Sequence, residues 1–185
     1  MALTESKMLA LGTTAPAFAL PDVTTGKTVR REDFSAQKAL LVAFICAHCP
    51  FVKHIETALA AVGKEYQKKS LAMVAISAND VATNPDDSPD HLKAQAKRLG
   101  FVFPYLYDET QETARAYGAA CTPDLFLFDQ ERKLVYRGQF DASRPGDNLA
   151  VTGEDLRAAL DAVLADKTVA ADQRPSIGCN IKWKE

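Results

Sequence analysis

The sequence has no large excess of charge of either sign and no long apolar run. Its 185 residues carry 22 Lys and Arg against 24 Asp and Glu, a formal net charge of −2 at pH 7. Such a balance provides no basic surface for nucleic acid or for an anionic membrane. No apolar run approaches the ~20 residues that span a bilayer. We therefore expect partners other than nucleic acid and membranes.

Cysteine is also scarce, with four residues in the whole chain. Four are too few for a disulfide scaffold, and a chain of this length builds a core without such bridges. The first eleven residues contain Glu5 and only a short apolar patch, unlike a secretory signal. We therefore expect a cytoplasmic protein, in which cysteines are catalytic, metal-binding or inert core residues.

The hydrophobic pattern predicts one α/β domain over residues 1–185, since no repeat or linker interrupts it. Residues 38–45 and 71–77 are apolar runs typical of strands buried on both faces. Between them, apolar residues recur every three or four positions from 52 to 66, which predicts a helix. A strand, a helix and a second strand in this order predict two parallel strands.

The next part of the chain alternates between turn formers and helical patterns. Residues 79–89 are polar and rich in turn formers, which predicts a mobile surface loop. A helix is expected over 89–99, with Pro89 at its first position and Gly100 just after its end. A shorter helix is expected over about 109–117.

The last third predicts an antiparallel hairpin from strands 124–128 and 134–137. Thr152 with Asp155 resembles a capping box and opens a last helix that ends near residue 164. The tail, about 167–185, lacks periodicity but contains apolar residues, so we expect it to dock on the domain. These elements predict a central mixed sheet with helices on both faces.

Three stretches resemble the thioredoxin-fold superfamily. Residues 44–53 (FICAHCPFVK) resemble its active-site segment, Phe-Trp-Ala-x-Trp-Cys-x-x-Cys-Lys, and residues 117–123 (YGAACTP) resemble the segment before its cis-proline. Residues 12–22 (GTTAPAFALPD) resemble the opening of the redoxin branch, which contains alkyl hydroperoxide reductase, thiol-specific antioxidant and other peroxiredoxin-like proteins. The resemblance implies a thioredoxin-like fold and thiol chemistry.

The alignment of this motif decides which cysteine matches the family nucleophile. Cys46 and Cys49 spell C-x-x-C, but Phe44 aligns Cys49, and not Cys46, with the nucleophilic position. The second cysteine of thioredoxins then falls on Val52. Cys46 precedes the nucleophile from the end of the strand.

The position of Cys49 favours a reactive thiolate independently of the family. A cysteine just before a helix that begins at Pro50 lies near unpaired N–H groups and the positive end of the helix dipole. Such thiols titrate between about 3.5 and 7.5 instead of about 8.5. His48 and Lys53 add positive charge nearby when His48 is protonated. Cys46 lacks these advantages.

The sequence departs from both family patterns. Peroxiredoxins have a hydroxyl residue three positions before the reactive cysteine and a proline seven before, where this chain has Cys46 and Val42. Thioredoxins bury an acid where this chain has Ala43. A peroxidase reaction is therefore less favoured, and the thioredoxin cycle does not transfer unchanged.

The resolving thiol is expected to be Cys46 first and Cys121 second. The peroxiredoxin analogy implies that the Cys46 and Cys49 side chains lie close together, whereas Cys121 is equally natural as a small buried residue. Cys179 either packs over the site or anchors the tail, and we favour anchoring.

The expected substrate-binding residues come from the two halves of the family motif. The resemblance implies a cis peptide bond between Thr122 and Pro123, with backbone that pairs with an extended substrate. His48 and Pro50 lie on either side of the nucleophile and are expected to contact the same substrate.

These residues predict a thiol-disulfide oxidoreductase with no organic cofactor and no metal. Its partners would be a protein or small-molecule disulfide, or a peroxide, and a thiol reductant. The alternatives are a peroxiredoxin-like thiol peroxidase with an antioxidant role, or a former enzyme that only binds. A copper or zinc metallochaperone is a further alternative, with ligands from Cys46, His48, Cys49 and Cys121, and His91 as the distant ligand.

Overall fold

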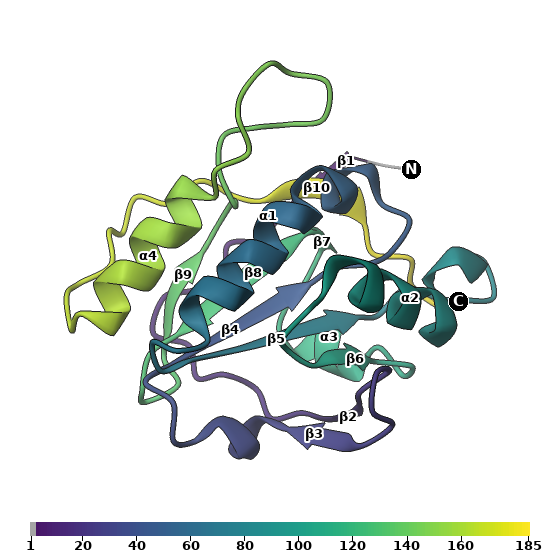
Figure 1. Ribbon diagram of the computed structural model, residues 1–185, viewed down its shortest axis with the longest axis horizontal. Helices are drawn as coiled ribbons and strands as arrows, with labels where there is room; N and C mark the ends of the chain where they lie inside the picture. The colour runs from purple at the N-terminus through teal and green to yellow at the C-terminus, as the bar shows by residue number, and fades with distance from the viewer. Residues whose placement is uncertain (1–2) are drawn as a thin grey trace.

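The computed structural model describes residues 3–185. A five-stranded sheet lies at its centre, in the order β6-β5-β4-β8-β9 (Figure 1). Strands β4, β5 and β6 are parallel, whereas β8 is antiparallel to β4 and β9 is antiparallel to β8. The strand bounds are Ala39–Phe44 for β4, Leu71–Ser77 for β5, Tyr105–Tyr107 for β6, Asp124–Phe128 for β8 and Leu134–Arg137 for β9.

Helices cover both faces of this sheet. Successive residues of a strand point to opposite faces, and both faces of β4 are apolar, so both have to be covered. Leu41 of β4 packs in the layer under α1, α2 and α4, whereas its neighbour Leu40 packs in the layer that includes α3 residues. Figure 1 shows α1 lying across the front of the sheet between α4 and α2. The helices are α1 (Pro50–Tyr66), α2 (Pro89–Leu99), α3 (Glu112–Ala116) and α4 (Glu154–Leu164).

Two small sheets complete the fold. Strand β10 from the tail lies between β1 and β7 and is antiparallel to both. Strands β2 and β3 form a separate hairpin. The bounds are Leu3–Glu5 for β1, Ala19–Pro21 for β2, Thr28–Arg30 for β3, Cys121–Thr122 for β7 and Ile177–Asn180 for β10. Two 3-10 helices, η1 (Arg31–Phe34) and η2 (Pro85–Asp87), lie in connections.

The mixed sheet with helices on both faces confirms the predicted fold class. The parallel β4–β5 pair, the β8–β9 hairpin and helix α2 occur where the pattern places them. Gly100 follows α2 with φ of +62°, a left-handed conformation that suits glycine. Among residues 3–185, the structure contains no helix long and apolar enough to cross a bilayer.

Three local predictions were wrong. Residues 79–89 are not simply a surface loop, because Asn79, Asp80 and Asp87 are buried and η2 lies within the segment. Helix α3 is shorter than predicted, since Gln111 has a positive φ of 65° just before it. The N-cap of α4 is a glycine, residue 153, and not the predicted threonine one position earlier.

Candidate functional site

Cys49 is the residue that immediately precedes helix α1. Its backbone is extended, with φ of −65° and ψ of 125°, and Pro50 is the first helical residue. The first turn of a helix leaves N–H groups unpaired at the positive end of the helix dipole, and proline at its first position loses no hydrogen bond. The Cys49 side chain is fully buried at this position.

The Cys49 sulfur is surrounded by hydrogen-bonding groups from three segments. It lies 2.8 Å from the Cys179 sulfur and 3.2 Å from the Thr122 carbonyl oxygen. A hydrogen bond from the Cys46 thiol is the largest influence on its pKa, which falls to about 4. Burial opposes this shift, while hydrogen bonds from Cys179, Thr122 and the Val52 backbone support it. The surroundings of Cys49 therefore favour the thiolate form over the thiol.

Cys46 has the opposite properties, because it is the donor in this pair. The hydrogen bond to Cys49, burial and the negative charge of Asp87 raise its pKa well above the ordinary value. Its sulfur lies 3.5 Å from Thr122 Oγ1 and 3.9 Å from His48 Nδ1. These influences favour the protonated thiol of Cys46, the form that can donate a hydrogen bond to Cys49.

The absorbance of the thiolate in the far ultraviolet measures this arrangement without requiring reagent access. In the reduced protein, we expect one thiolate to appear with a midpoint near pH 4. Because the pKa of Cys49 is lowered on folding, it stabilises the folded protein above its unfolded pKa of ~8.5, and this stabilisation is lost as pH falls through about 4. The signal is expected to disappear in Cys49→Ser and to persist in Cys121→Ser. A single midpoint near 8.5 would contradict the assignment.

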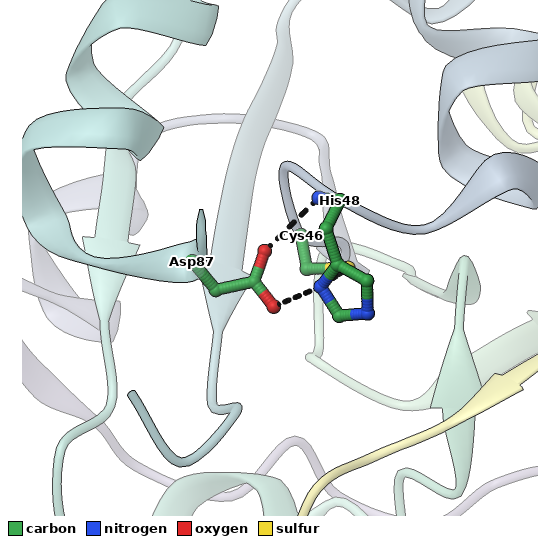
Figure 2. Close-up of side chains that lie close together, drawn as sticks. All are labelled: Cys46, His48 and Asp87. Carbon is green, nitrogen blue, oxygen red and sulfur yellow. Dashed lines mark hydrogen bonds and ion pairs between the residues drawn. The ribbon is translucent and has the colours of Figure 1, made fainter. Parts of the chain in front are cut away.

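The segment between the two cysteines is held by one buried carboxylate, Asp87 of η2 (Figure 2). Its Oδ1 accepts hydrogen bonds from the backbone N–H groups of Ala47, at 2.8 Å, and His48, at 3.0 Å. Its Oδ2 lies 2.5 Å from His48 Nδ1 and accepts a 2.8 Å hydrogen bond from Asn79 Nδ2. Asp87 therefore fixes both the turn and the imidazole ring.

Replacing Asp87 by asparagine is expected to lower the pKa of His48 and destabilise the fold by about 1–3 kcal/mol. The hydrogen bond to Asp87 raises the His48 pKa, so this interaction stabilises the protein fully below ~6.5 and is lost as pH rises through the raised value. Burial raises the Asp87 pKa, but hydrogen bonds from His48 and Asn79 outweigh burial, and the Asp87 pKa is lowered. The stabilisation from ionised Asp87 is therefore lost as pH falls through this lowered pKa. The stability difference is therefore expected to be largest between about pH 4 and 6.5.

Two measurements test this variant. Imidazole NMR gives the His48 titration, and denaturant unfolding at several pH values gives the stability difference. His54 lies in α1 and contacts Ser143 instead of Asp87, so it is the internal control for the NMR titration. An unchanged His48 pKa in Asp87→Asn would show that the carboxylate does not hold the ring.

A second buried network lies behind Cys46. Gln95 of α2 donates hydrogen bonds to the Cys46 carbonyl at 3.3 Å and to Glu56 Oε2 at 2.9 Å. The Tyr105 hydroxyl donates to Gln95 Oε1 at 3.1 Å. These contacts join the segment after β4 to α1, α2 and β6, and they fix the backbone from which the Cys46 thiol projects.

Cys46, His48 and Asp87 also place three potential metal-ligand atoms within 4.8 Å of one another. Both oxygens of Asp87 already accept hydrogen bonds, and His48 Nδ1 contacts one of them (Figure 2). A metal would have to displace these contacts. Of the other ligands considered from the sequence, His91 lies beside Ser88 at the start of α2, with Nδ1 at 2.8 Å from the hydroxyl.

The proline loop lies against the Cys49 sulfur. The peptide bond between Thr122 and Pro123 is cis, as the resemblance implies, and the Thr122 carbonyl contacts Cys49. The contacts of Cys121 differ from those of Cys49. The Cys121 sulfur lies 3.6 Å from the Pro123 carbonyl oxygen and 4.0 Å from the Ser176 carbonyl oxygen. Burial raises its pKa far above the ordinary value, which leaves it an unreactive thiol.

Sequence reasoning missed two residues of the site. Asp87 lies in a polar stretch whose composition resembles any exposed turn, and no spacing pattern connects it with His48. The sequence favours Cys179 as a tail anchor, whereas β10 brings its sulfur to Cys49. The alternation of apolar residues at 177, 179 and 181 was the available signal, because it indicates a strand with Cys179 on its inner face.

Comparisons with known proteins show the family and the fold of this chain. Residues 11–137 match the model of the AhpC/TSA family. A crystal structure of a conserved protein from Geobacillus kaustophilus superposes with a TM-score of 0.97 and is 53% identical, covering 100% of this chain and 97% of that chain. The thiol-disulfide oxidoreductase ResA of Geobacillus thermodenitrificans is 27% identical over 131 residues, which are 71% of this chain and 70% of the relative.

The fold comparison extends to more distant proteins. The thioredoxin domain of a thiol-disulfide oxidoreductase from Bacteroides vulgatus superposes with a TM-score of 0.58 at 22% identity, covering 70% of this chain and 88% of that chain. Sheet order and helix placement thus define a thioredoxin-like fold, and the family match with the similarity to ResA makes the chain an oxidoreductase of this class. Within that class, the chain belongs to the AhpC/TSA family.

Proposed function

We propose that this protein catalyses thiol–disulfide exchange with Cys49 as its nucleophile. The observation that carries the proposal is the position of Cys49 at the start of α1, where its sulfur lies beside Cys179 and the cis-proline loop and where hydrogen bonds lower its pKa. The thiolate is the attacking species in exchange with a disulfide. The similarity to ResA, a thiol-disulfide oxidoreductase, supports the same reaction class.

In the first step, the Cys49 thiolate attacks one sulfur of a substrate disulfide. A bond forms between Cys49 Sγ and that sulfur, the substrate disulfide breaks, and the other sulfur leaves as a thiolate. Loss of negative charge from Cys49 weakens the hydrogen bonds that it accepts from the Cys46 thiol and the Thr122 hydroxyl. The substrate is a protein or small-molecule disulfide, and a thiol reductant completes the cycle.

A disulfide fits the site better than a peroxide does. The position three residues before Cys49 is occupied by Cys46, whose sulfur is committed to hydrogen bonds with Cys49 and Thr122. A thiol is a weaker donor than a hydroxyl, and here it stabilises the nucleophile. The Cys49 thiolate can still react with peroxide when it becomes accessible, so thiol peroxidase activity is the second candidate function.

Rates of Cys49 oxidation by oxidised glutathione and by hydrogen peroxide, at the same pH, separate the two functions. We expect oxidised glutathione to react faster with Cys49 than with free cysteine at pH 6. The reason is that the lowered pKa makes Cys49 a thiolate at this pH, whereas free cysteine is protonated. The peroxide rate is expected to exceed that of a free thiolate by less than about tenfold. A peroxide rate several orders of magnitude above that of the disulfide would favour the peroxidase.

A further inference from the structure

The tail strand β10 occupies the edge of the proline loop. Cys179 of β10 pairs with Thr122 of β7, and Asn180 pairs with Cys121. Beyond the strand, Ile181 N–H donates to the Ala120 carbonyl at 3.1 Å. An extended polypeptide cannot pair with Thr122 while this strand is docked, because the edge already has a partner.

A glycine permits this docking. A Cβ atom at Gly178 would lie 2.0 Å from the Thr122 carbonyl oxygen, a backbone atom that no rotamer change can move. Only glycine allows two backbones to approach so closely. The same approach brings the next residue, Cys179, over the Cys49 sulfur.

Further contacts hold the tail after β10. Lys182 N–H donates to Asn79 Oδ1 at 2.8 Å, and the other end of this amide donates to Asp87. Gln111 Nε2 donates to the Lys182 carbonyl at 2.8 Å. The Asp87 carboxylate that positions His48 is thus connected through one side chain to the strand that carries Cys179.

We propose that Cys179 is the resolving thiol, presented to Cys49 by β10 in the manner of an extended substrate. The proposal rests on the proposed function. Its basis is the 2.8 Å separation of the two sulfurs, one on the residue before α1 and the other on β10, 130 positions later in the chain. Cys46 is instead the donor that keeps Cys49 ionised, and the Cys121 sulfur is directed at the Pro123 and Ser176 carbonyls.

The reaction balances with two thiols of this chain and one substrate disulfide. Attack by Cys49 leaves a mixed disulfide and releases the first substrate thiolate. The Cys179 thiol loses its proton to solvent or to the departing sulfur, and its sulfur attacks Cys49 Sγ. A Cys49–Cys179 disulfide forms, the mixed disulfide breaks, and the second substrate thiolate leaves. Two electrons pass to the substrate, and an external dithiol returns them to the protein.

The position of β10 also determines access to the nucleophile. Cys49 is fully buried, and Cys179 is 5% exposed. A substrate therefore reaches the Cys49 sulfur when β10 shifts, and the return of the strand delivers the resolving thiol. In the mixed disulfide, the substrate sulfur takes the space that Cys179 occupies in the reduced protein.

Glutathione release and peptide mapping test this assignment. Reduced full-length protein is mixed with a large excess of oxidised glutathione, quenched with acid, and analysed for released glutathione and disulfide-linked peptides. The proposal expects two glutathiones released per chain and a Cys49–Cys179 peptide. Cys179→Ser is expected to release one and to retain glutathione on Cys49, whereas Cys121→Ser, a matched buried cysteine on the adjacent strand, behaves as wild type.

Each other result counts against the proposal. A wild-type Cys46–Cys49 or Cys49–Cys121 disulfide overturns the role of Cys179 and leaves the proposed function intact. A stable mixed disulfide between glutathione and Cys49 in the wild-type protein would also overturn the role of Cys179 and leave the proposed function intact. If no glutathione is released and no cysteine is modified, the proposed function fails together with this inference. The wild-type arm needs no substitution, so misfolding of a variant does not weaken the test.

Discussion

Cys49→Ser is expected to lose thiol–disulfide exchange by at least about 10³-fold, while Cys121→Ser retains it within about threefold. Serine at position 49 keeps the shape of the side chain but is not ionised near neutral pH, so no nucleophile remains. Cys121 is equally buried, and its sulfur faces backbone carbonyls of the proline loop and tail. The measurement is the second-order rate constant with oxidised glutathione.

Thermal unfolding of both variants serves as the control for folding. Each replaces one buried sulfur by oxygen, but Cys49→Ser also loses the stabilisation that comes from the lowered Cys49 pKa, so the activities are compared at a temperature where both variants are folded. Equal loss of activity in Cys49→Ser and Cys121→Ser would show that the fold, and not the nucleophile, has been tested. Full activity in Cys49→Ser would contradict the proposed function.

Gly178→Ala is expected to release β10 from the proline loop and to expose Cys49. The added Cβ would lie 2.0 Å from the Thr122 carbonyl oxygen, so one of the two backbones has to move. Overpacking of this kind costs about 1–3 kcal/mol. Because each 1.4 kcal/mol changes an equilibrium about tenfold, the alkylation rate of Cys49 by a neutral reagent is expected to rise by about 5- to 150-fold. Mass spectrometry of the Cys49 peptide measures this rate.

Gly146→Ala is the matched control. Gly146 has φ of +87°, so alanine there strains the backbone, but the added Cβ meets nothing within 4 Å. This variant is expected to lose about 1–2 kcal/mol of stability without a change in Cys49 labelling. If both variants expose Cys49 equally, general destabilisation explains the result. If Gly178→Ala leaves labelling unchanged, β10 does not cover the nucleophile.

The central part of the fold could be predicted from sequence because its signals are local. The apolar runs that form β4 and β5 and the helical period of α1 follow directly from residue order. The strands β1, β2 and β3 have three residues each, too few for a periodic pattern, and β10 shows only the brief apolar alternation at 177, 179 and 181. They exist because tertiary contacts supply their partners, as for Ile177 opposite Glu5.

The residues of the candidate site also divide into those that the sequence could predict and those that it could not. Cys46, His48 and Cys49 lie in one segment, so their proximity could be predicted, and the resemblance to a known family supplied Thr122 and Pro123. Asp87 and Cys179 reach the site through long-range packing. Neither has a local signal of function, because an acid in a polar stretch and a cysteine in an apolar strand are both ordinary.

The central claim is that Cys49 reacts first with a disulfide, and rapid-quench mapping tests it most directly. Reduced protein is mixed with excess oxidised glutathione at pH 6 and stopped with acid at the earliest times that show modification. The first glutathione is predicted on Cys49, because its lowered pKa makes it a thiolate at that pH while burial raises the pKa of Cys179. First capture on Cys46 or Cys179 would contradict the account.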